Sequence, residues 1–440
     1  MKQLTLQILL EQKWQDIAQL TLIAPEKGIR SPCKLGYELD YSLQWLERDD
    51  EHACSLTLPV QLMANHESDH WFGFLDDIVP AGAARRHWVL FLGLNNLSEP
   101  ARDSVLLEKG TIAPVGNLRI KESLPVRDPR STLHLRTFPV KDVVERNSEF
   151  LEYAQEMGAI SGGATGAGGE APKLLLRLNR ENQVWIDTFQ DDHSIPDGHF
   201  LVKFPRGQRT KDDCDILRAE YHFYHELTDM GFCTIDTQQM QLLEGEHYPS
   251  LWLPRFDTYW DGSHWQRYGL ESVYSILNKP AGSYLNHFEI IRTICSLMQK
   301  RSVSFDAERF VCDWVCRDLL NIAFANTDNH GRNSALLKKP NAIWLSPIYD
   351  FAPMKADREG ITRTTKWGAP YEEGGEYRWQ EIAAQLEGLC PAEKTMATLK
   401  ETAQMLTGLK TRLEKRGVSE HILKMGFSYL DDKLKRWGLL

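Results

Sequence analysis

The segment NTDNHGRN, residues 326–333, constrains the fold most strongly, because polar and acidic residues separate two apolar patterns there. Before it, DAERFVCDWVCRDLLNIAFA repeats apolar residues at the spacing of a long helix. After it, the strand-like run AIWLSPIY leads into SPIYDFAP, which places Asp350 22 residues beyond Asp328. Asp, Asn, His and Gly also form ordinary turns, so the meaning of the segment depends on the residues around it.

The composition indicates a soluble, acidic protein of about two or three domains. The chain has 440 residues, and its 51 Lys and Arg against 61 Asp and Glu argue against a surface built for DNA or anionic membranes. Hydrophobic residues make up 42% and exclude a disordered chain. No run approaches the ~18 apolar residues that span a bilayer, and MKQLTLQILLEQKW lacks the features of a signal peptide. Eight cysteines without a C-x-x-C pair indicate reduced thiols and a cytoplasmic protein.

The order of the patterns predicts an α+β fold. The middle of the chain carries the strand-like runs PKLLLRL, QVWIDTF, HFLVKFP and YPSLWLPRF, with the helical pattern DDCDILRAEYHFYHELTDMGF among them. From about residue 285 the patterns are helical, with further segments near 379–388, 392–414 and 418–437. We therefore expect a small α+β unit at 1–150, a strand-rich middle and a helical C-terminal third.

Asp328, Asn333 and Asp350 have the spacing that phosphoryl transfer by protein kinases requires. One Asp orients the attacking hydroxyl and accepts its proton, an Asn five residues on binds Mg²⁺, and a second Asp from a D-F-G-like turn holds the metal against the phosphates. Carboxylate and amide oxygens are hard ligands that suit Mg²⁺. Asp350-Phe351-Ala352 supplies such a turn, so the set favours phosphoryl transfer over an ordinary turn.

The upstream residues follow the order found in a kinase, in which a glycine-rich loop precedes a strand Lys and a helical Glu that pairs with it. Gly166, Gly168 and Gly169 come first here. Lys203 lies within the strand-like FLVKFP, and Glu220 follows 17 residues later in a helical pattern. The glycine segment matches neither G-x-G-x-x-G nor the P-loop, so a flexible linker is the alternative interpretation. Small residues that end in a Lys can still let backbone N–H groups approach phosphate.

In these residues the chain resembles the HipA-type serine/threonine kinases, the toxins of bacterial type II toxin–antitoxin pairs. That family carries a glycine/alanine-rich loop ending in Lys, a strand Lys, an R-F-D hinge, a T-D-x-H-x-x-N catalytic motif and a P-x-Y-D metal site. The corresponding segments here are GAGGEAPK at 166–173, Lys203, RFD at 255–257, TDNHGRN at 327–333 and PIYD at 347–350. The N-terminal part also resembles the small β-rich subdomain of the family, through FLDDIVPAG at 74–82 and GNLRI at 116–120.

The resemblance implies a protein-kinase-like, two-lobed α+β fold with a β-rich N-terminal lobe and an all-helical C-terminal lobe. The implied units are a HipA-like N-terminal β-rich subdomain at 1–150, the nucleotide-binding part of the N-terminal lobe at 151–260, and a helical catalytic lobe at 261–440.

The resemblance also implies a site for ATP and Mg²⁺. Asp328 would be the catalytic base, and Asn333 and Asp350 would hold Mg²⁺. The expected nucleotide contacts come from the glycine loop, the strand Lys, the hinge and the two motifs: Gly168, Gly169, Glu170, Ala171, Pro172, Lys173, Lys203, Pro254, Arg255, Phe256, His330, Gly331, Arg332, Asn333, Tyr349 and Asp350.

Two positions depart from the family pattern. Family members commonly carry Ser in the glycine loop, and its autophosphorylation ejects the loop and silences the kinase. Aligned on Lys173, this position is Gly166 here, so such regulation is either lost or uses the neighbouring Thr165 as the autophosphorylation site. At the hinge, Pro254 stands where an acidic residue can occur, and backbone contacts to adenine would survive that change.

The resemblance implies a growth-arresting kinase that phosphorylates a translation factor such as an aminoacyl-tRNA synthetase. It also implies a small helix-turn-helix antitoxin as partner, through which DNA contact would mainly occur, and no membrane partner. One alternative is a catalytically silent regulator that binds nucleotide or antitoxin, against which the complete set of Lys203, Asp328, Asn333 and Asp350 argues. The other is a metal-dependent phosphohydrolase, in which Lys203 and the glycine loop would lack a role.

Overall fold

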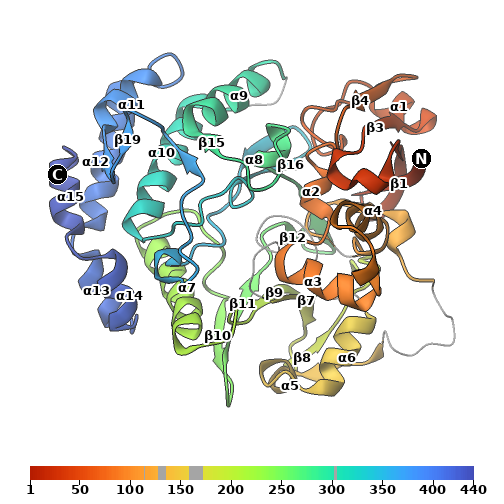
Figure 1. The fold of residues 1–440 in the computed structure, drawn as a ribbon, viewed down its shortest axis with the longest axis horizontal. Helices are drawn as coiled ribbons and strands as arrows, with labels where there is room; N and C mark the ends of the chain where they lie inside the picture. Colours follow the sequence, from red (N-terminus) through yellow and green to blue (C-terminus); the bar gives the residue numbers. More distant parts are fainter. Residues whose placement is uncertain (113, 127–134, 158–171, 302–304) are drawn as a thin grey trace.

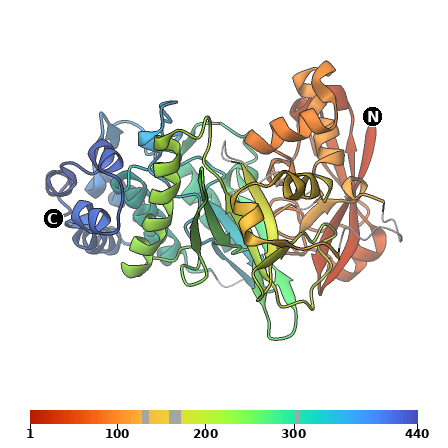
Figure 2. The same cartoon turned by 90° about the horizontal axis from the view of Figure 1, so that it is seen from below.

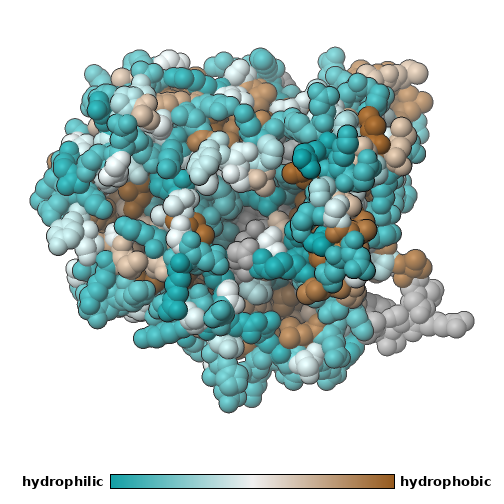
Figure 3. All heavy atoms as spheres, viewed as in Figure 1, coloured by the Kyte–Doolittle hydropathy of each residue, from teal (hydrophilic) through white to brown (hydrophobic). Residues whose placement is uncertain are grey.

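The computed structural model describes residues 1–112, 114–126, 135–157, 172–301 and 305–440. They form a mixed α/β structure with the N-terminal unit at one end, the C-terminal helices at the other and a sheet between them (Figures 1 and 2). The face shown in Figure 3 is mostly hydrophilic, with scattered hydrophobic residues. The predicted glycine-loop residues Thr165, Gly168, Gly169, Glu170 and Ala171 lie outside the described residues. No helix in the described ranges is both long and apolar enough to cross a membrane.

The N-terminal unit is built on a five-stranded antiparallel sheet with the order β4-β3-β2-β1-β5. Its strands are β1 Lys2–Leu10, β2 Lys13–Leu22, β3 Cys33–Tyr37, β4 Asn65–Ser68 and β5 Leu118–Ile120. Glu11 and Gln12 join β1 to β2 with φ values of 47° and 65°, the left-handed conformation that two-residue hairpin turns favour. The helices of this unit are α1 Leu39–Trp45, α2 Leu75–Ile78, α3 Gly82–Phe91 and α4 Glu99–Lys109. Leu6, Leu20 and Leu35 belong to its hydrophobic core.

A six-stranded antiparallel sheet with the order β10-β11-β9-β7-β8-β6 occupies the middle of the chain. Its strands are β6 Phe138–Pro139, β7 Lys173–Leu178, β8 Gln183–Trp185, β9 Gly198–Lys203, β10 Gln241–Glu244 and β11 Pro249–Pro254. The four predicted strands are therefore confirmed as β7, β8, β9 and β11. In the register of β7 and β9, Lys173 lies opposite Lys203, so the sheet itself brings two lysines together.

Three helices accompany this sheet: α5 Val140–Val144, α6 Ser148–Glu156 and α7 Lys211–Asp229. The predicted long helix is α7. It begins with a capping box, in which the Thr210 side chain accepts from Asp213 N and the Asp213 side chain accepts from Thr210 N. These bonds satisfy backbone donors at the helix start and so define where α7 begins.

The prediction of an all-helical C-terminal lobe is wrong, because residues 261–440 also contain strands. β14 Gly269–Ser272, β16 Ala335–Lys339 and β17 Ala342–Leu345 form an antiparallel three-stranded sheet. Asn341, in the turn between β16 and β17, has a φ of 59°, so two short apolar runs fold back and satisfy their backbone hydrogen bonds as a hairpin. Two-stranded sheets pair β12 Thr258–Trp260 with β13 Trp265–Arg267, β15 Leu285–Asn286 with β18 Thr365–Lys366, and β19 Glu372–Glu373 with β20 Glu376–Tyr377.

The C-terminal helices supply much of the hydrophobic core of this region. They are α8 Val273–Ile276, α9 His287–Gln299, α10 Ala307–Ala323, α11 Trp379–Gln385, α12 Ala392–Leu406, α13 Leu409–Lys415, α14 Glu420–Gly426 and α15 Leu430–Arg436. The chain leaves α10 at Ala325, which has a left-handed φ of 55°, and then enters segment 326–333 and β16. The predicted order of helix, polar segment and strand is confirmed. The two-lobed division and the boundaries near 150 and 260 stay predictions.

Glu271 on β14 links the N-terminal unit to the rest of the chain. Its buried carboxylate accepts hydrogen bonds from Leu56 N at 2.8 Å and from Ser275 Oγ at 2.9 Å, and it pairs with Lys338 Nζ at 3.1 Å. The Ser55 hydroxyl also donates to it. Because a buried charge is costly without such partners, this contact holds the two parts in one arrangement.

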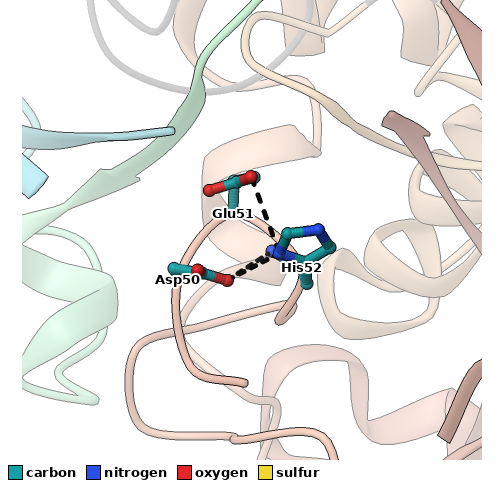
Figure 4. A group of neighbouring side chains, drawn as sticks. All are labelled: Asp50, Glu51 and His52. Atoms are coloured by element: carbon teal, nitrogen blue, oxygen red, sulfur yellow. Dashed lines mark hydrogen bonds and ion pairs between the residues drawn. The ribbon is translucent and has the colours of Figure 1, made fainter. Parts of the chain in front are cut away.

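Asp50, Glu51 and His52 form a buried charged group within the N-terminal unit (Figure 4). His52 Nδ1 lies 2.7 Å from Asp50 Oδ1 and 3.6 Å from Glu51 Oε1, and Arg48 forms an ion pair with Asp50. Among the described residues, Glu51 Oε2 has no hydrogen-bond partner. Burial and the neighbouring charge of Asp50 raise the pKa of Glu51 to about 7. In the folded protein Glu51 is therefore mostly protonated below pH 7.

Glu51→Gln is expected to stabilise the protein above pH 7 more than at pH 5. A carboxyl whose pKa rises on folding contributes stability below its unfolded pKa of 4.5, and this contribution is lost as the pH rises through 7. The amide avoids that loss, which is on the order of 2 kcal/mol. Urea unfolding at pH 5 and pH 8 measures the difference, with the exposed Glu47→Gln as control. An equal effect of Glu51→Gln at both pH values would refute this explanation.

Candidate active site

Lys203 occupies the centre of the candidate site. It ends β9, which lies between β7 and β11, and the residue is 2% exposed. Its Nζ lies 2.6 Å from Glu220 Oε1 and also forms an ion pair with Asp350. Glu220 belongs to α7, so the predicted pairing of a strand Lys with a helical Glu is confirmed. The Tyr224 hydroxyl, one helical turn further on, donates to Glu220 Oε1 at 3.0 Å and extends the buried network.

Asp350 follows β17 in a left-handed conformation, with a φ of 51°. This conformation is uncommon for residues with side chains, and such residues concentrate at functional sites. The carboxylate meets both opposed lysines: Lys203, and Lys173, whose Nζ lies 3.4 Å from Oδ2. Phe351 N donates to the Tyr224 hydroxyl at 3.3 Å. Helix α7 therefore fixes both the Glu partner of Lys203 and the turn that carries Asp350.

Opposing effects set the charge states of this network. Burial raises the pKa of Asp350, but the ammonium groups of Lys173 and Lys203 outweigh it and hold that pKa well below its ordinary value. Burial lowers the pKa of Lys203, whereas the carboxylates of Asp350 and Glu220 raise it by more. For Lys173, burial prevails and the pKa falls. At neutral pH the site therefore holds an Asp350 carboxylate against a Lys203 ammonium group.

Segment 326–333 presents Asp328 beside this network. Asp328 N donates to Asn326 Oδ1 at 3.2 Å, and Asn333 Nδ2 donates to Asp328 O at 2.7 Å, so two side chains of the segment hold its backbone. His330 Nε2 lies 3.4 Å from Asp328 Oδ1. The Asp328 side chain is 29% exposed, which leaves its carboxylate accessible to a substrate group.

Buried polar atoms without partners lie in the same segment. Among the described residues, they include Asn333 Oδ1, His330 Nδ1 and the Thr327 hydroxyl. A buried polar atom without a partner costs free energy, which a bound ligand or ion can recover. Gly331 admits no side chain, since a Cβ atom there would lie 2.8 Å from a ring carbon of Tyr274. The segment is therefore closely packed while some of its polar atoms stay available.

Two pockets meet at Lys203 and Asp350, because both residues line each of them. The first has a volume of about 470 Å³ and is charged. Asp328 lines this pocket together with Lys173, Lys203 and Asp350. Its remaining lining residues are Phe204, Pro205, Arg206, Asp213, Ile216, Leu217, Glu220, Ala352 and Met354.

The second pocket has a volume of about 400 Å³ and is mostly apolar. The rings of Phe256 and Tyr349, which both line it, stack with their centroids 4.9 Å apart. Arg255 brings little free charge, because its Nε donates to Asp257 Oδ1 at 2.9 Å. The remaining lining residues are Val115, Leu201, Lys203, Ile235, Leu253, Pro254, Leu270 and Asp350.

The structure separates the predicted site residues into groups. The charged pocket contains Lys173, Lys203, Asp328 and Asp350. The apolar pocket contains Pro254, Arg255, Phe256 and Tyr349, and shares Lys203 and Asp350. A third cavity, of about 580 Å³, is lined by His330, Gly331 and Asn333 and also reaches Tyr349.

Two predicted residues lie apart from these groups. Pro172 directly precedes β7, and its carbonyl accepts a hydrogen bond from Phe204 N at 3.1 Å. Arg332 does not line any of the three spaces; its Nη2 donates instead to Asp76 O at 3.0 Å, in the N-terminal unit. The site therefore contacts a part of the chain that lies far away in sequence.

The sequence patterns missed several residues that shape the site. Tyr224 could have been found, since it lies four residues after Glu220, the spacing at which side chains on one helix face meet. Val115, Ile235 and Leu270 line the apolar pocket from separate parts of the chain. No local pattern links these three residues, so the sequence carried no signal for them.

The arrangement suits a ligand that is flat and apolar at one end and polyanionic at the other. The apolar pocket can enclose the flat part, and the ammonium groups of Lys173 and Lys203 can pair with the anionic part. The accessible Asp328 carboxylate can accept a proton from a group that reacts there.

Comparison with known proteins identifies the class of this chain. Residues 165–426, more than half of the chain, match the model of the HipA-like C-terminal domain. The chain therefore belongs to the HipA-like family, and the resemblance seen in its motifs is confirmed.

One similar solved structure is HipA from Shewanella oneidensis MR-1, in a complex of the toxin–antitoxin system HipA, HipB and its operator DNA. It is 16% identical, has a TM-score of 0.63, and the match covers 99% of this chain and 97% of that one, which shows a shared fold. The Helicobacter pylori proinflammatory kinase CtkA is 13% identical, with a TM-score of 0.36 and coverage of 55% of this chain and 88% of that one. No curated protein sequence matches the chain.

Glu220→Ala is expected to lower the free energy of unfolding by about 3 kcal/mol, because it removes a buried carboxylate partner of Lys203. The Tyr224 hydroxyl loses its acceptor as well. Glu244→Ala is the matched control, since Glu244 pairs with Arg218 of α7 at an exposed position and such pairs contribute under about 1 kcal/mol. Urea unfolding measures both variants, and equal losses would contradict the importance of the buried pair.

Proposed function

We propose that the chain is an ATP- and Mg²⁺-dependent protein serine/threonine kinase that acts as a growth-arresting toxin in the cytoplasm. One observation carries the proposal: an apolar and a charged pocket meet at Lys203 and Asp350, and the charged one holds the Asp328 carboxylate. ATP has the matching chemistry, with a flat base at one end and a triphosphate at the other. Membership of the HipA-like family supports the same choice.

The apolar pocket would receive the adenine base. Leu201 of β9 and Leu253 of β11 supply apolar walls, and the stacked rings of Phe256 and Tyr349 form another. The Arg255 guanidinium is neutralised by Asp257, so the base would not meet an unpaired charge there. A mostly apolar pocket with few polar groups is the usual environment of such a ligand.

Lys173 and Lys203 would bind the phosphates. Their position opposite each other on β7 and β9 aims two ammonium groups at one space, and both already pair with a carboxylate there. Charge-assisted hydrogen bonds to phosphate oxygens are strong. Residues 168–171 remain proposed phosphate contacts by family resemblance, and Thr165 remains the proposed autophosphorylation site.

Asn333 and Asp350 would hold Mg²⁺. Asn333 Oδ1 is buried without a partner among the described residues, and the two lysines keep Asp350 ionised, so both offer oxygen ligands of the kind Mg²⁺ prefers. When bound, the metal would neutralise charge on the phosphates.

Asp328 is the proposed catalytic base. Its accessible carboxylate would orient a substrate Ser or Thr hydroxyl and accept its proton while the hydroxyl oxygen bonds to the γ-phosphorus. The bond from that phosphorus to the bridging oxygen breaks, and ADP leaves with the oxygen. Asn326 and Asn333 hold the backbone around Asp328, which keeps the base in place during the step.

A small helix-turn-helix antitoxin is the proposed partner, and a translation factor such as an aminoacyl-tRNA synthetase is the proposed substrate. The similar Shewanella oneidensis structure contains HipA together with HipB and operator DNA, which supports an antitoxin partner. The net charge of −10 favours DNA contact through that partner rather than through this chain. The substrate proposal depends on the family resemblance.

Asp328→Asn is expected to slow phosphate transfer by at least about 100-fold, because the amide keeps the shape of the side chain but cannot accept the proton. Its affinity for ATP should stay within about twofold of wild type, since phosphate binding depends on the lysines. Transfer of label from γ-labelled ATP to purified aminoacyl-tRNA synthetases measures the rate, and calorimetry measures ATP binding.

Asp313→Asn, on an exposed part of α10, is the matched control and should transfer phosphate at the wild-type rate. An Asp328→Asn variant as active as wild type would overturn the assignment of Asp328. A wild-type chain that binds ATP without transferring phosphate, or that hydrolyses phosphate esters without ATP, would overturn the kinase proposal.

A further inference from the structure

We infer that α2 of the N-terminal unit positions segment 326–333, with Asp77 as a positioning residue that acts through Arg332. The inference deepens the proposed function and rests on it, because it assigns a role in the same site. Asp77 lines none of the three spaces around the site, so its effect on the reaction would be indirect.

Arg332 connects segment 326–333 to α2. Its side chain is buried and donates from Nη2 to Asp76 O at 3.0 Å. The two residues are 256 positions apart, so this hydrogen bond crosses from the N-terminal unit into the proposed catalytic segment. Helix α2 contacts α8, and Figure 1 shows the two helices at the junction between the N-terminal unit and the rest of the chain.

The backbone of Arg332 is also linked to each residue proposed to hold Mg²⁺, because it either adjoins that residue in the chain or is hydrogen-bonded to its chain neighbour. Its carbonyl accepts a hydrogen bond from the Tyr349 hydroxyl, and Tyr349 directly precedes Asp350. Asn333 follows Arg332 in the chain and donates to Asp328 O. A shift of Arg332 would therefore reach Asp328, Asn333 and Asp350 together.

Asp77 lies buried beside this contact. Its Oδ2 accepts from the N–H of Ser272, the residue that caps α8, at 2.8 Å. Burial raises the pKa of Asp76 and raises that of Asp77 to about 7, while the Arg332 guanidinium acts to lower both. The Asp77 side chain is therefore mostly a carboxylate only above pH 7. Among the described residues, Asp77 Oδ1 and Arg332 Nε have no hydrogen-bond partner. Above pH 7 the Asp77 carboxylate and the Arg332 guanidinium are opposite charges that are buried and incompletely paired. Their attraction then helps to keep Arg332 at α2.

A purely structural junction is the competing explanation, because other contacts also join the N-terminal unit to the rest. Arg301 Nε lies 2.9 Å from Asp49 Oδ2, and Gly73 N donates to Asn278 Oδ1 at 3.1 Å. None of these residues belongs to segment 326–333 or lines the pockets of the site. They therefore provide a control that weakens the junction without touching the segment.

Hydrogen exchange of the full chain, read by mass spectrometry, tests the inference without relying on activity. Asp77→Asn keeps the volume and the acceptor for Ser272 N but removes the charge that faces Arg332. At pH 8, where Asp77 is ionised, we expect amide exchange in 327–333 to become about fivefold faster in Asp77→Asn and to stay unchanged in Asp49→Asn. If segment 327–333 exchanged in Asp77→Asn at the wild-type rate, or equally faster in both variants, the inference would be overturned. If Asp77→Asn does not fold, Arg332→Met tests the same contact with the same expected acceleration.

Kinetics adds a readout that a structural role alone would not change. At pH 8, Asp77→Asn is expected to lower kcat about tenfold while the KM for ATP stays within about twofold, since misplacement of the segment slows transfer more than binding. The double variant Asp77→Asn/Arg332→Met should lose no more kcat than Arg332→Met alone, because both changes disrupt one contact. Additive losses, or a change in KM alone, would overturn the inference. If the wild-type chain transferred no phosphate, only the kinase proposal would fail. The positioning inference would still be tested, because hydrogen exchange measures the stability of segment 327–333 without needing activity.

Discussion

The buried ammonium group of Lys203 is the constraint on which the rest of the site depends. A charge that is almost completely removed from water must have fixed partners. Glu220 reaches it from α7 and Asp350 from the turn after β17, so satisfying this one group requires a helix and a turn to pack against β9. Tyr224 joins the two, since it donates to Glu220 and accepts from the backbone of Phe351. Sheet, helix and turn are therefore parts of one charge-balanced unit.

The apolar and the charged pocket both contain Lys203 and Asp350. The N-terminal unit contributes a residue to the apolar pocket and a contact to segment 326–333. Val115 lines the apolar pocket, and Gly116 N donates to Asp257 Oδ2 at 2.7 Å, which orients the carboxylate that neutralises Arg255. On the other side, Arg332 binds the backbone of α2. The first 120 residues therefore contribute to the geometry of the site, besides forming a hydrophobic core of their own.

Short-range spacing was enough to predict the residues of the charged network, because the chemistry dictates which side chains are needed and how far apart they lie. Lys203 stood out as a charge within an apolar strand, and its pairing with Glu220 is confirmed. The all-helical C-terminal lobe, which the family resemblance implied, was wrong. The strand-like run AIWLSPIY did predict β17, but β16 was missed, because periodicity over a run of five residues does not distinguish a strand from a helix. The contact between Arg332 and α2 could not be predicted, since it depends on tertiary packing and no local pattern reports it.

A crystal structure of the chain with Mg²⁺ and a non-hydrolysable ATP analogue tests the proposed kinase site most directly. We expect the adenine in the pocket between Leu201, Leu253 and Tyr349, the phosphates beside Lys203, and the cation on Asn333 and Asp350. A nucleotide bound elsewhere, or a cation held without Asp350, would contradict the proposed site.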